Sequence, residues 1–385
     1  MVSPGPDLAV LLATSGHSGV DRVMGNLVPG LAAAGLTVDL LGIEGHGPHW
    51  GPLPPGIRRL PLGSRHVYSA LPALVRYLRL ERPRALLADK DRINRVALIG
   101  RWLADVDTRV YLRSGTTISV DLASRRWLDR AAQTLSMRRL YRFADGVLVP
   151  SLGAARDLVA YARLPPGQVR VVPSPVVTPD LPARAGGSAP HRWLGPGMPP
   201  VILGVGELCG RKDFATLLRA HARLRQRVDC RLLILGEGRQ REALESLAGE
   251  LGSAAEVDLP GWVSNPYPYL ARARAFALTS RWEGMPVVLI EALAVGVPVV
   301  ATDCPSGPAE ILDRGRVGPL VPVGDDAALA DALETLLRQP PRREDLTAAA
   351  LPYTVVRSVE AYLRAMDFVD SALQSAAAGG GETRG

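Results

Sequence analysis

At 385 residues the chain is too long for one ordinary hydrophobic core, and its length predicts two domains. Its 47% hydrophobic and 22% charged residues are typical of a soluble globular protein, and no run of about 18 residues is free enough of charges and helix breakers to span a membrane. The net charge of +7 divides into +11 for residues 1–200 and −4 for residues 201–385, so we expect the first half to meet an anionic surface or substrate.

The first half opens with the pattern of a doubly wound sheet. An apolar run over 8–13 leads into the loop SGHSGVDRV, a helical stretch to Ala34 and a strand over 38–41. The glycines of this loop, Gly16 and Gly19, suit a phosphate contact, but the GxGxxG pattern is incomplete and a plain strand-to-helix turn fits equally well. We expect loop over 42–65, which is rich in glycine, proline and histidine.

Four further strands are predicted in this half, over 85–88, 109–113, 146–150 and 168–172. The sequence Asp89-Lys90-Asp91 after the first of them matches the metal-binding D-x-D of some sugar transferases. A match of three residues arises easily by chance, so we interpret it as a polar strand end and expect no metal site.

The segment 121–145 interleaves basic residues with aromatic and aliphatic ones. Such a helix either lies on an anionic membrane face or packs one face on the core and exposes a solvated arginine face. The basic residues concerned are Arg125, Arg126, Arg130, Arg138, Arg139 and Arg142.

Residues 176–199 are dense in proline and glycine and predict a linker between an N-terminal domain over 1–175 and a C-terminal domain over 200–353. A last helix is predicted over 354–374, followed by a disordered tail over 375–385. Three widely separated cysteines offer neither a metal-binding spacing nor a disulfide framework, which predicts a reducing cytoplasm.

The second half repeats the strand, glycine loop and helix with VILGVGELCGRKDFATLLRA. Arg211 and Lys212 stand where its helix begins, and cations there oppose the helix dipole at a cost of about 0.3–1 kcal/mol each. Positions that work against stability favour a function, and two cations beside a helix start suit a diphosphate.

Two carboxylates stand eight residues apart in RWEGMPVVLIEALAVGVPVVATDCPSGPAEIL. Glu291 falls among apolar residues of a predicted helix and needs polar partners, for which the hydroxyls of a ribose would serve. Glu283 precedes the helix, where a favourable dipole interaction is the alternative to a ligand contact.

These motifs, taken in order, resemble the GT-B fold glycosyltransferases of family 4, a retaining group that uses nucleotide sugars. Glu283 and Glu291 match the E-x7-E motif of that family, and GVGELCGRKDFATLLRA, LLILGEGRQREAL and LPGWVSNPYPYL match it more weakly. The resemblance is strong over 201–324 and loose before. It implies an α/β architecture of two Rossmann-like, doubly wound domains that face a central cleft, with the last helix packed back on the N-terminal domain.

The resemblance also implies roles for single residues. Arg211 and Lys212 would hold the donor diphosphate and act in catalysis with Glu283, which would hold the donor sugar. Glu291 would hold the ribose, and the Gly16–Gly19 loop would approach the phosphates. The backbone of Gly284 and Met285 would also contact the sugar, and the turn at Gly261 and Val263 would border the base.

Three departures from the family pattern concern the site. Many relatives carry a basic residue where Glu207 stands, and many carry glycine where Pro286 stands. Many also have a histidine where this chain has Arg113-Ser114-Gly115-Thr116, so no catalytic histidine is carried over on the acceptor side.

The resulting prediction is a retaining glycosyltransferase that moves a hexose-type sugar from a UDP- or GDP-linked donor to a glycan or lipid-linked saccharide. We expect no cofactor and no metal, no nucleic-acid partner, and a cytoplasmic location at which contact with the inner face of the cell membrane stays open. A non-catalytic GT-B scaffold or partner subunit and a sugar-nucleotide epimerase of the same fold are the alternatives. A dehydrogenase is disfavoured because no complete GxGxxG with a well-placed acidic residue is present.

Overall fold

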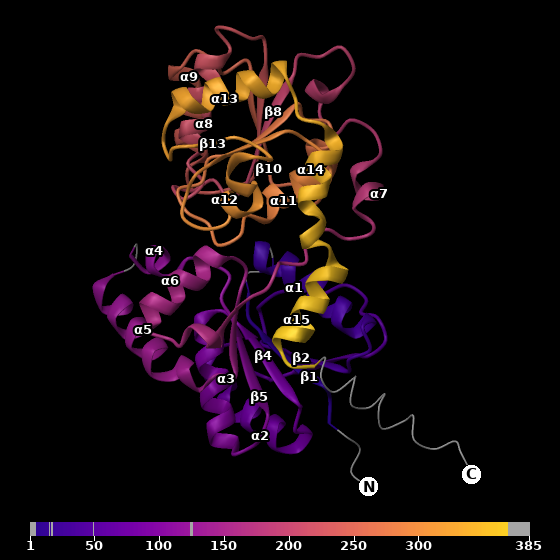
Figure 1. The fold of residues 1–385 in the computed structure, drawn as a ribbon, viewed down its shortest axis with the longest axis vertical. Coiled ribbons are helices and arrows are strands. Elements are labelled where there is room, and N and C mark those ends of the chain that lie inside the picture. Colours follow the sequence, from indigo (N-terminus) through magenta and orange to yellow (C-terminus); the bar gives the residue numbers. More distant parts are fainter. Residues whose placement is uncertain (1–4, 15, 17, 49, 124–125, 369–385) are drawn as a thin grey trace, which may run out of the picture. The chain divides into compact units, whose positions relative to one another are not determined.

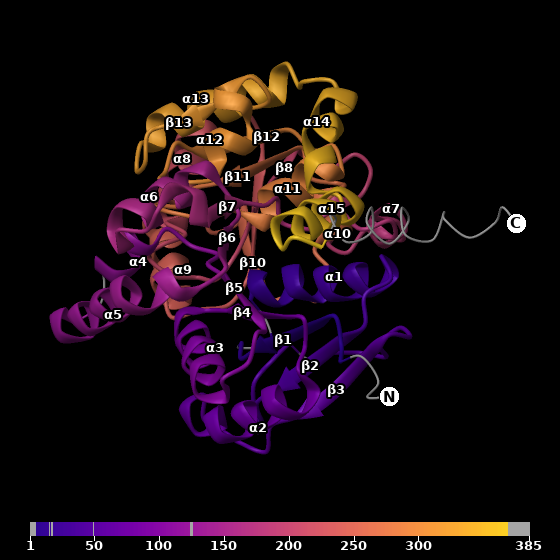
Figure 2. The same ribbon diagram turned by 60° about the horizontal axis from the view of Figure 1, so that its bottom comes forward.

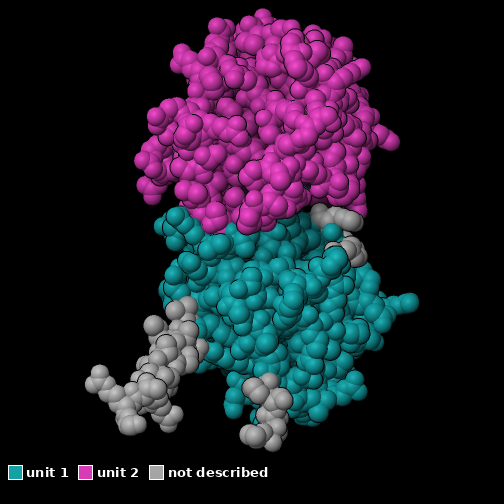
Figure 3. Space-filling view, turned by 90° about the vertical axis from the view of Figure 1, so that its right-hand side faces the viewer, with its two compact units in different colours: residues 1–175, 355–385 teal, residues 176–354 magenta. Residues whose placement is uncertain are grey.

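The computed structural model describes residues 5–14, 16, 18–48, 50–123 and 126–368, and the chain forms two compact units (Figure 1, Figure 3). Unit 1 comprises residues 1–175 and 355–385, and unit 2 comprises residues 176–354. None of the helices in the described ranges is both long and apolar enough to cross a lipid bilayer.

Unit 1 is built on a parallel sheet in which the chain first winds one way and then the other. The strand order is β3-β2-β1-β4-β5-β6-β7, so the direction reverses between β1 and β4. The strands are β1 (Leu8–Leu12), β2 (Val38–Gly42), β3 (Ile57–Pro61), β4 (Ala85–Asp89), β5 (Arg109–Arg113), β6 (Gly146–Val149) and β7 (Val169–Val171).

Helices cover both faces of this sheet because alternate strand residues point to opposite sides. Ala9 and Leu11 of β1 pack into the core under α2, α3 and α6, whereas Leu8 and Val10 pack against α1 and α15. Figure 2 shows α1 beside α15. The helices of this unit are α1 (Gly19–Ala33), α2 (Leu71–Glu81), α3 (Asp91–Ala104), α4 (Ile118–Ala123), α5 (Trp127–Leu140), α6 (Leu152–Ala162) and α15 (Val355–Ala365), with 3-10 turns η1 (Tyr68–Ala70), η2 (Tyr141–Phe143) and η3 (Pro166–Gln168).

Unit 2 repeats the same plan with a smaller parallel sheet. Its strand order is β10-β9-β8-β11-β12-β13, and the direction reverses between β8 and β11. The strands are β8 (Val201–Val205), β9 (Arg231–Leu235), β10 (Val257–Gly261), β11 (Ala275–Leu278), β12 (Val299–Thr302) and β13 (Leu320–Val321).

The helices of unit 2 also lie on both faces, over two separate apolar cores. They are α7 (Leu181–Ala185), α8 (Phe214–Leu224), α9 (Arg241–Glu250), α10 (Tyr267–Leu270), α11 (Val287–Ala294), α12 (Pro308–Ile311), α13 (Asp326–Arg338) and α14 (Arg343–Ala350), with 3-10 turns η4 (Arg192–Leu194), η5 (Asp313–Gly315) and η6 (Leu351–Tyr353). Two doubly wound parallel sheets confirm the predicted α/β fold class.

Several elements differ from the expectation. The segment 176–199, predicted as a linker, contains α7 and η4 and contributes Val176, Leu181 and Trp193 to a core of unit 2. The loop predicted over 42–65 contains the edge strand β3, and β13 and α14 were not predicted. The last helix begins at Val355 as expected and ends at Ala365, and the predicted disordered tail lies outside the described residues.

A buried ion pair joins three elements of unit 1. The Arg113 guanidinium lies 2.6 Å from Asp89 Oδ2 through Nη1, and its Nε donates to the Tyr362 hydroxyl of α15 at 2.9 Å. The side chains of Arg113 and Asp89 are 3% and 1% exposed. Arg113, the first residue of the segment Arg113-Ser114-Gly115-Thr116, is therefore turned inward and joins α15 to the ends of β4 and β5.

Replacing Asp89 with Asn tests the role of this ion pair. The change leaves the Arg113 charge buried without its counter-ion, which costs about 3–5 kcal/mol of folding stability. Faster hydrogen exchange of the β4, β5 and α15 amides, measured by mass spectrometry, reports the loss within unit 1. Glu44→Gln removes an exposed ion pair with Arg65 and is the control, expected to cost less than about 1 kcal/mol; equal effects of the two variants contradict the assignment.

Candidate functional site

The predicted site residues of unit 2 gather where its sheet reverses direction. Arg211 and Lys212 follow β8, and Glu283, Gly284 and Met285 follow β11, the strand that pairs with β8. Both loops lie at the carboxyl ends of parallel strands. In open α/β sheets ligands bind outside the carboxyl ends of strands at such a reversal.

Glu283 is the centre of this group. Its Oε1 lies 2.6 Å from Lys212 Nζ and accepts a hydrogen bond from Ser280 Oγ at 2.7 Å, while its Oε2 lies 2.9 Å from Arg211 Nη1. The Glu283 and Lys212 side chains are 7% and 11% exposed, and that of Arg211 is 33% exposed. One carboxylate thus holds two cations, of which Arg211 is the more accessible to solvent.

The electrostatics of Glu283 follow from this geometry. Burial alone would raise the pKa of its carboxyl group, but the charges of Lys212 and Arg211 and the bonds from Lys212 and Ser280 outweigh it, so the pKa lies below its ordinary value. Glu283 is therefore ionised at neutral pH.

Main-chain and hydroxyl bonds hold the loops around Glu283 together. Arg281 N donates to Arg211 O at 2.8 Å, and the Thr279 hydroxyl donates to Lys212 O at 2.8 Å. The loop after β12 joins through Thr302, whose hydroxyl donates to Ser280 O at 2.6 Å. Three loops therefore share one set of contacts around the carboxylate.

Two glycines permit this close packing. A β-carbon at Gly206 would lie 3.1 Å from the Lys212 stem, and one at Gly307 would lie 2.6 Å from Pro286. Gly307 also has φ +93°, which L side chains rarely adopt. Gly206 thus gives Lys212 its path to Glu283, and Gly307 brings the loop after β12 against the start of α11.

Glu291 lies apart from this cluster, on the buried face of α11. Its side chain is fully buried, and the Tyr267 hydroxyl donates to its Oε1 at 3.1 Å. Tyr267 is itself buried, and the Arg184 guanidinium lies 4.7 Å from the centre of its ring. The carboxylate is positioned by its own unit and is not open to solvent in this structure.

The remaining predicted contacts of unit 2 lie in neighbouring loops of the same sheet edge. Gly261 ends β10 with φ +98° and accepts a hydrogen bond from Gly236 N, and Val263 is half-buried two residues on. Gly284 is buried and Met285 half-buried, both just before α11, where Pro286 is the N-cap residue.

Unit 1 places its glycine loop at the equivalent reversal of its own sheet, after β1. Gly16 has φ +89°, and Gly19 is the exposed first residue of α1. Asp21 closes a capping box with Ser18 and also accepts a hydrogen bond from the Thr14 hydroxyl. Burial opposes the charge of Asp21, but these hydroxyl and amide donors outweigh it and keep the pKa of Asp21 low.

The polar strand end at 89–91 is occupied by protein partners. Asp89 pairs with Arg113, while Asp91 pairs with Arg95 at 2.8 Å and accepts from the Tyr141 hydroxyl at 3.0 Å. Among the residues that the structure describes, no group of three or more His, Cys, Asp or Glu side chains suits a metal ion. In this structure the carboxylates of Asp89 and Asp91 are therefore both paired with arginines of the same unit.

Three residues around the site were missed by the sequence analysis. Ser280 stands three positions before Glu283, and a hydroxyl that close to a catalytic candidate is a usable signal. Tyr267 lies 24 residues before Glu291 and gives no signal at all. Trp282 has a buried indole Nε1 with no hydrogen-bond acceptor within the described part of the chain, beside Glu283.

The sequence matches two family models, one in each half. Residues 18–175 match the Glycosyl transferase 4-like domain, and residues 190–351 match Glycosyl transferases group 1. Two solved structures share the fold at low identity: lipopolysaccharide outer core galactosyltransferase WaaB (TM-score 0.70, 20% identity, 93% of this chain and 98% of that one) and Anabaena HepE with UDP-glucose (0.76, 16%, 94% and 99%). The two family models and these neighbours support a glycosyltransferase of GT-B fold.

Curated relatives match over part of their length. The chain is 32% identical over 247 residues to the N-acetylgalactosamine-N,N'-diacetylbacillosaminyl-diphospho-undecaprenol 4-alpha-N-acetylgalactosaminyltransferase of Campylobacter jejuni, covering 64% of this chain and 65% of the relative. It is 36% identical over 233 residues to the GDP-mannose-dependent alpha-(1-6)-phosphatidylinositol monomannoside mannosyltransferase of Mycolicibacterium smegmatis, covering 56% and 59%. The chain thus spans less than two thirds of the length of either relative.

The lowered pKa of Glu283 predicts a pH dependence of stability. A group whose pKa is lowered in the folded state stabilises the protein above its unfolded pKa and loses that contribution as pH falls through the folded pKa. The free energy of unfolding of the wild type is expected to exceed that of Glu283→Gln by about 3 kcal/mol at neutral pH. This difference is expected to shrink as pH falls below about 4.

Urea unfolding of both proteins at several pH values measures this difference. Asp345→Asn removes the acidic partner of a solvent-exposed pair with Arg342 in the same unit and is the control, with little change in the free energy of unfolding expected at any of these pH values. A difference between wild type and Glu283→Gln that is constant with pH speaks against the charge of Glu283 as its source.

Proposed function

We propose that the protein is a retaining glycosyltransferase of family 4 type that transfers a hexose-type sugar from a UDP- or GDP-linked donor to a glycan or lipid-linked saccharide. The observation that carries this proposal is the buried Glu283 carboxylate between Lys212 and Arg211 at the reversal of the second sheet. The pair Glu283 and Glu291 is taken as the E-x7-E motif.

The chemistry needs a site that stabilises negative charge. Breaking the bond between the anomeric carbon and the phosphate oxygen leaves two electrons on the leaving diphosphate, and preorganised cations stabilise that charge. Lys212 and Arg211 are such cations. The positive end of the α11 dipole, after Gly284 and Met285, adds to the stabilisation. In a front-face transfer the leaving phosphate oxygen accepts the proton of the acceptor hydroxyl, so neither a side-chain nucleophile nor a metal takes part.

The proposed acceptor follows from the relatives. The two curated relatives are named for their substrates, a diphospho-undecaprenol-linked saccharide and a phosphatidylinositol monomannoside. Both are sugars on lipids, and a similar acceptor here would place the enzyme at the inner face of the cell membrane. The scaffold and epimerase alternatives are not favoured, because the relatives and structural neighbours named above with a known activity transfer sugars.

A donor screen tests the proposal directly. Calorimetry with UDP-, GDP- and ADP-sugars is expected to give binding to a UDP- or GDP-sugar, and Lys212→Ala is expected to lower the transfer rate by about 10²–10³, the usual effect of removing one preorganised donor. Glu283→Ala is expected to abolish transfer. Glu250→Ala, which changes the exposed last residue of α9, is the control that should transfer normally. Failure of every nucleotide sugar to bind would overturn the donor site.

The internal ion pairs predict an unusual effect of Glu283→Gln on anion binding. In the wild type a diphosphate must share Arg211 and Lys212 with the Glu283 carboxylate. Two unit charges about 4 Å apart interact by roughly 4 kcal/mol at an effective dielectric constant of 20, so this competition weakens diphosphate binding. Glu283→Gln is therefore expected to bind inorganic pyrophosphate about tenfold or more tightly, although it loses transfer. Titration calorimetry measures this, with Glu250→Gln at the exposed end of α9 as the control; unchanged or weaker pyrophosphate binding contradicts the competition.

A further inference from the structure

The chain has only two lysines among its 45 basic residues, and each stands where a parallel sheet reverses direction. Lys212 follows β8, which pairs with β11 at the reversal of unit 2, and Lys90 follows β4, which pairs with β1 at the reversal of unit 1. Where arginine is the usual cation, a lysine supplies a compact point charge. Lys212 is paired with Glu283, whereas Lys90 has no role in the site described so far.

The backbone of Lys90 is strained. Its φ of +79° and ψ of 142° lie close to a region of conformational space that is essentially restricted to glycine. Arg82 and Arg163 of the same unit also have positive φ, but their ψ of 57° and 47° place them in the left-handed helical region that commonly ends a helix. Lys90 is also the N-cap of α3, where a cation opposes the helix dipole. Its position therefore costs stability twice.

The charge of Lys90 is not offset by the acids beside it. Asp89 pairs with Arg113 and Asp91 pairs with Arg95, so both neighbouring carboxylates are taken. The Lys90 side chain is half-buried, and it forms no ion pair or hydrogen bond with any residue that the structure describes. A half-buried ammonium group without a close partner has lost hydration that nothing in the described part of the chain replaces.

The charge of Lys90 acts on the glycine loop across the reversal. Burial raises the pKa of the Asp21 carboxyl group, the donors of Ser18 and Thr14 lower it more, and the charge of Lys90 lowers it further. Both oxygens of Asp21 already accept hydrogen bonds, Oδ1 from the Thr14 hydroxyl and Oδ2 from Ser18. Asp21 therefore attracts Lys90 without pairing with it. The ammonium group belongs to the carboxyl edge of the sheet at its reversal, where ligands bind in open α/β sheets.

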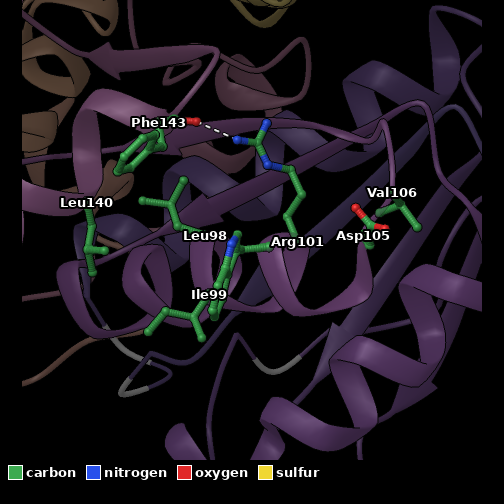
Figure 4. Close-up of a pocket in the computed structure, with 8 residues that line it drawn as sticks. Leu98, Ile99, Arg101, Asp105, Val106, Leu140 and Phe143 are labelled. Carbon is green, nitrogen blue, oxygen red and sulfur yellow. Dashed lines mark hydrogen bonds between the residues drawn. The ribbon is translucent and has the colours of Figure 1, made fainter.

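A cavity at the opposite edge of this sheet has a different character. It measures about 410 Å³ and is bordered by Asp105 before β5 and Phe143 before β6 (Figure 4). Its lining is mainly apolar, and Arg101, which also lines it, is already occupied. The Nη2 atom of Arg101 donates to Phe143 O at 2.7 Å, and its Nη1 lies 2.9 Å from Asp145 Oδ2. An anion is therefore not expected in this cavity.

We propose that Lys90 binds a phosphoryl group of the substrate at the carboxyl edge of the first sheet. An anion at Lys90 would offset the unfavourable dipole and restore the lost hydration, whereas a lysine that served only as a solvated surface group would gain nothing from a strained backbone. The anion is a phosphoryl group because the nucleotide donor and the lipid-linked acceptors named above carry phosphate, so its identity rests on the proposed function. The donor diphosphate and the phosphate on a lipid are its two sources.

Lysine footprinting of the full chain tests this proposal. Because the chain has two lysines, acetylation with acetic anhydride followed by peptide mass spectrometry reports Lys90 and Lys212 separately. UDP and GDP represent the donor, and farnesyl diphosphate represents a phosphate on a lipid. A probe at about ten times its Kd leaves about a tenth of its site free, so acetylation of Lys90 is expected to slow about tenfold. Sodium chloride at the same ionic strength is the control for general screening of charge.

The pattern of protection identifies the source of the phosphoryl group. Protection of Lys90 by UDP or GDP assigns it to the donor diphosphate, and protection by farnesyl diphosphate assigns it to a phosphate on a lipid. Equal acetylation of Lys90 with and without all three probes overturns the proposal. Protection of Lys212 alone would leave the donor site of unit 2 standing. This failure is therefore distinguishable from failure of the transferase proposal, in which no nucleotide sugar binds.

Lys90→Gly separates a ligand contact from a structural role. The change relieves the backbone strain and removes the cation, so the variant is expected to melt at or above the wild-type temperature. Its affinity for the protecting probe, measured by calorimetry, is expected to fall about tenfold, as the loss of one hydrogen bond from a charged group implies. Lys90→Arg keeps the charge and is expected to retain most of the affinity.

Arg163→Gly is the matched control. Arg163 is an exposed cation with positive φ at the end of α6, so its replacement also relieves a left-handed backbone. This variant is expected to melt at or above the wild-type temperature and to bind the probe as the wild type does. Wild-type affinity in Lys90→Gly would overturn the proposal, and a lowered melting temperature with that affinity would assign Lys90 a structural role.

Discussion

The arrangement of the loops in unit 2 depends on one buried carboxylate. Glu283 needs compensation because a charge that is 7% exposed has lost most of its hydration, and Lys212 and Arg211 provide it from the loop of the neighbouring strand. The bonds from Arg281 and Thr279 to the carbonyls of Arg211 and Lys212 hold the two loops at the distance that this pairing requires. The reversal between β8 and β11 makes the contact possible, because it brings two loops 71 residues apart in sequence to adjacent strand ends.

Buried ion pairs rarely add stability over a well-packed apolar core, so their presence needs another reason. The buried ion pairs of unit 1 and unit 2 have different roles. The Arg113 pair is closed on all sides and joins α15 to the sheet, which is a structural task. The Arg211 side chain is one third exposed and only partly used by Glu283, which leaves a cation at the sheet edge that a ligand can reach. Accessibility, more than charge, distinguishes the functional candidate from the structural one.

The sequence predicted the doubly wound architecture because apolar strands, glycine loops and helices alternate with little ambiguity. β3 was missed since Gly56 precedes it, Pro61 is its last residue, and its exposed Arg58 and Arg59 belong to an edge strand. For the site, motif spacing singled out Arg211, Lys212 and Glu283, which the structure brings together, and Glu291, which lies apart on the buried face of α11. It could not predict that Glu283 pairs with both cations, or that Tyr267 reaches Glu291, because tertiary packing alone makes these contacts. The inward position of Arg113 could not be predicted either, because it also depends on tertiary packing.

The basic segment 121–145 left two interpretations open from sequence, a helix on an anionic membrane face or a helix with a core face and a solvated face. Within unit 1, α5 turns a core face inward, with Gln133 and Met137 buried and Leu140 half-buried on one side, and it exposes Trp127 and Leu135 on the opposite side. At 1.5 Å per residue its fourteen residues extend about 21 Å, more than the roughly 17 Å of a five-residue strand. The helix follows α4 at the carboxyl side of β5 and ends beside the cavity at the amino side of β6. The helix therefore runs from the edge of this sheet that carries Gly16 and Gly19 to the opposite edge.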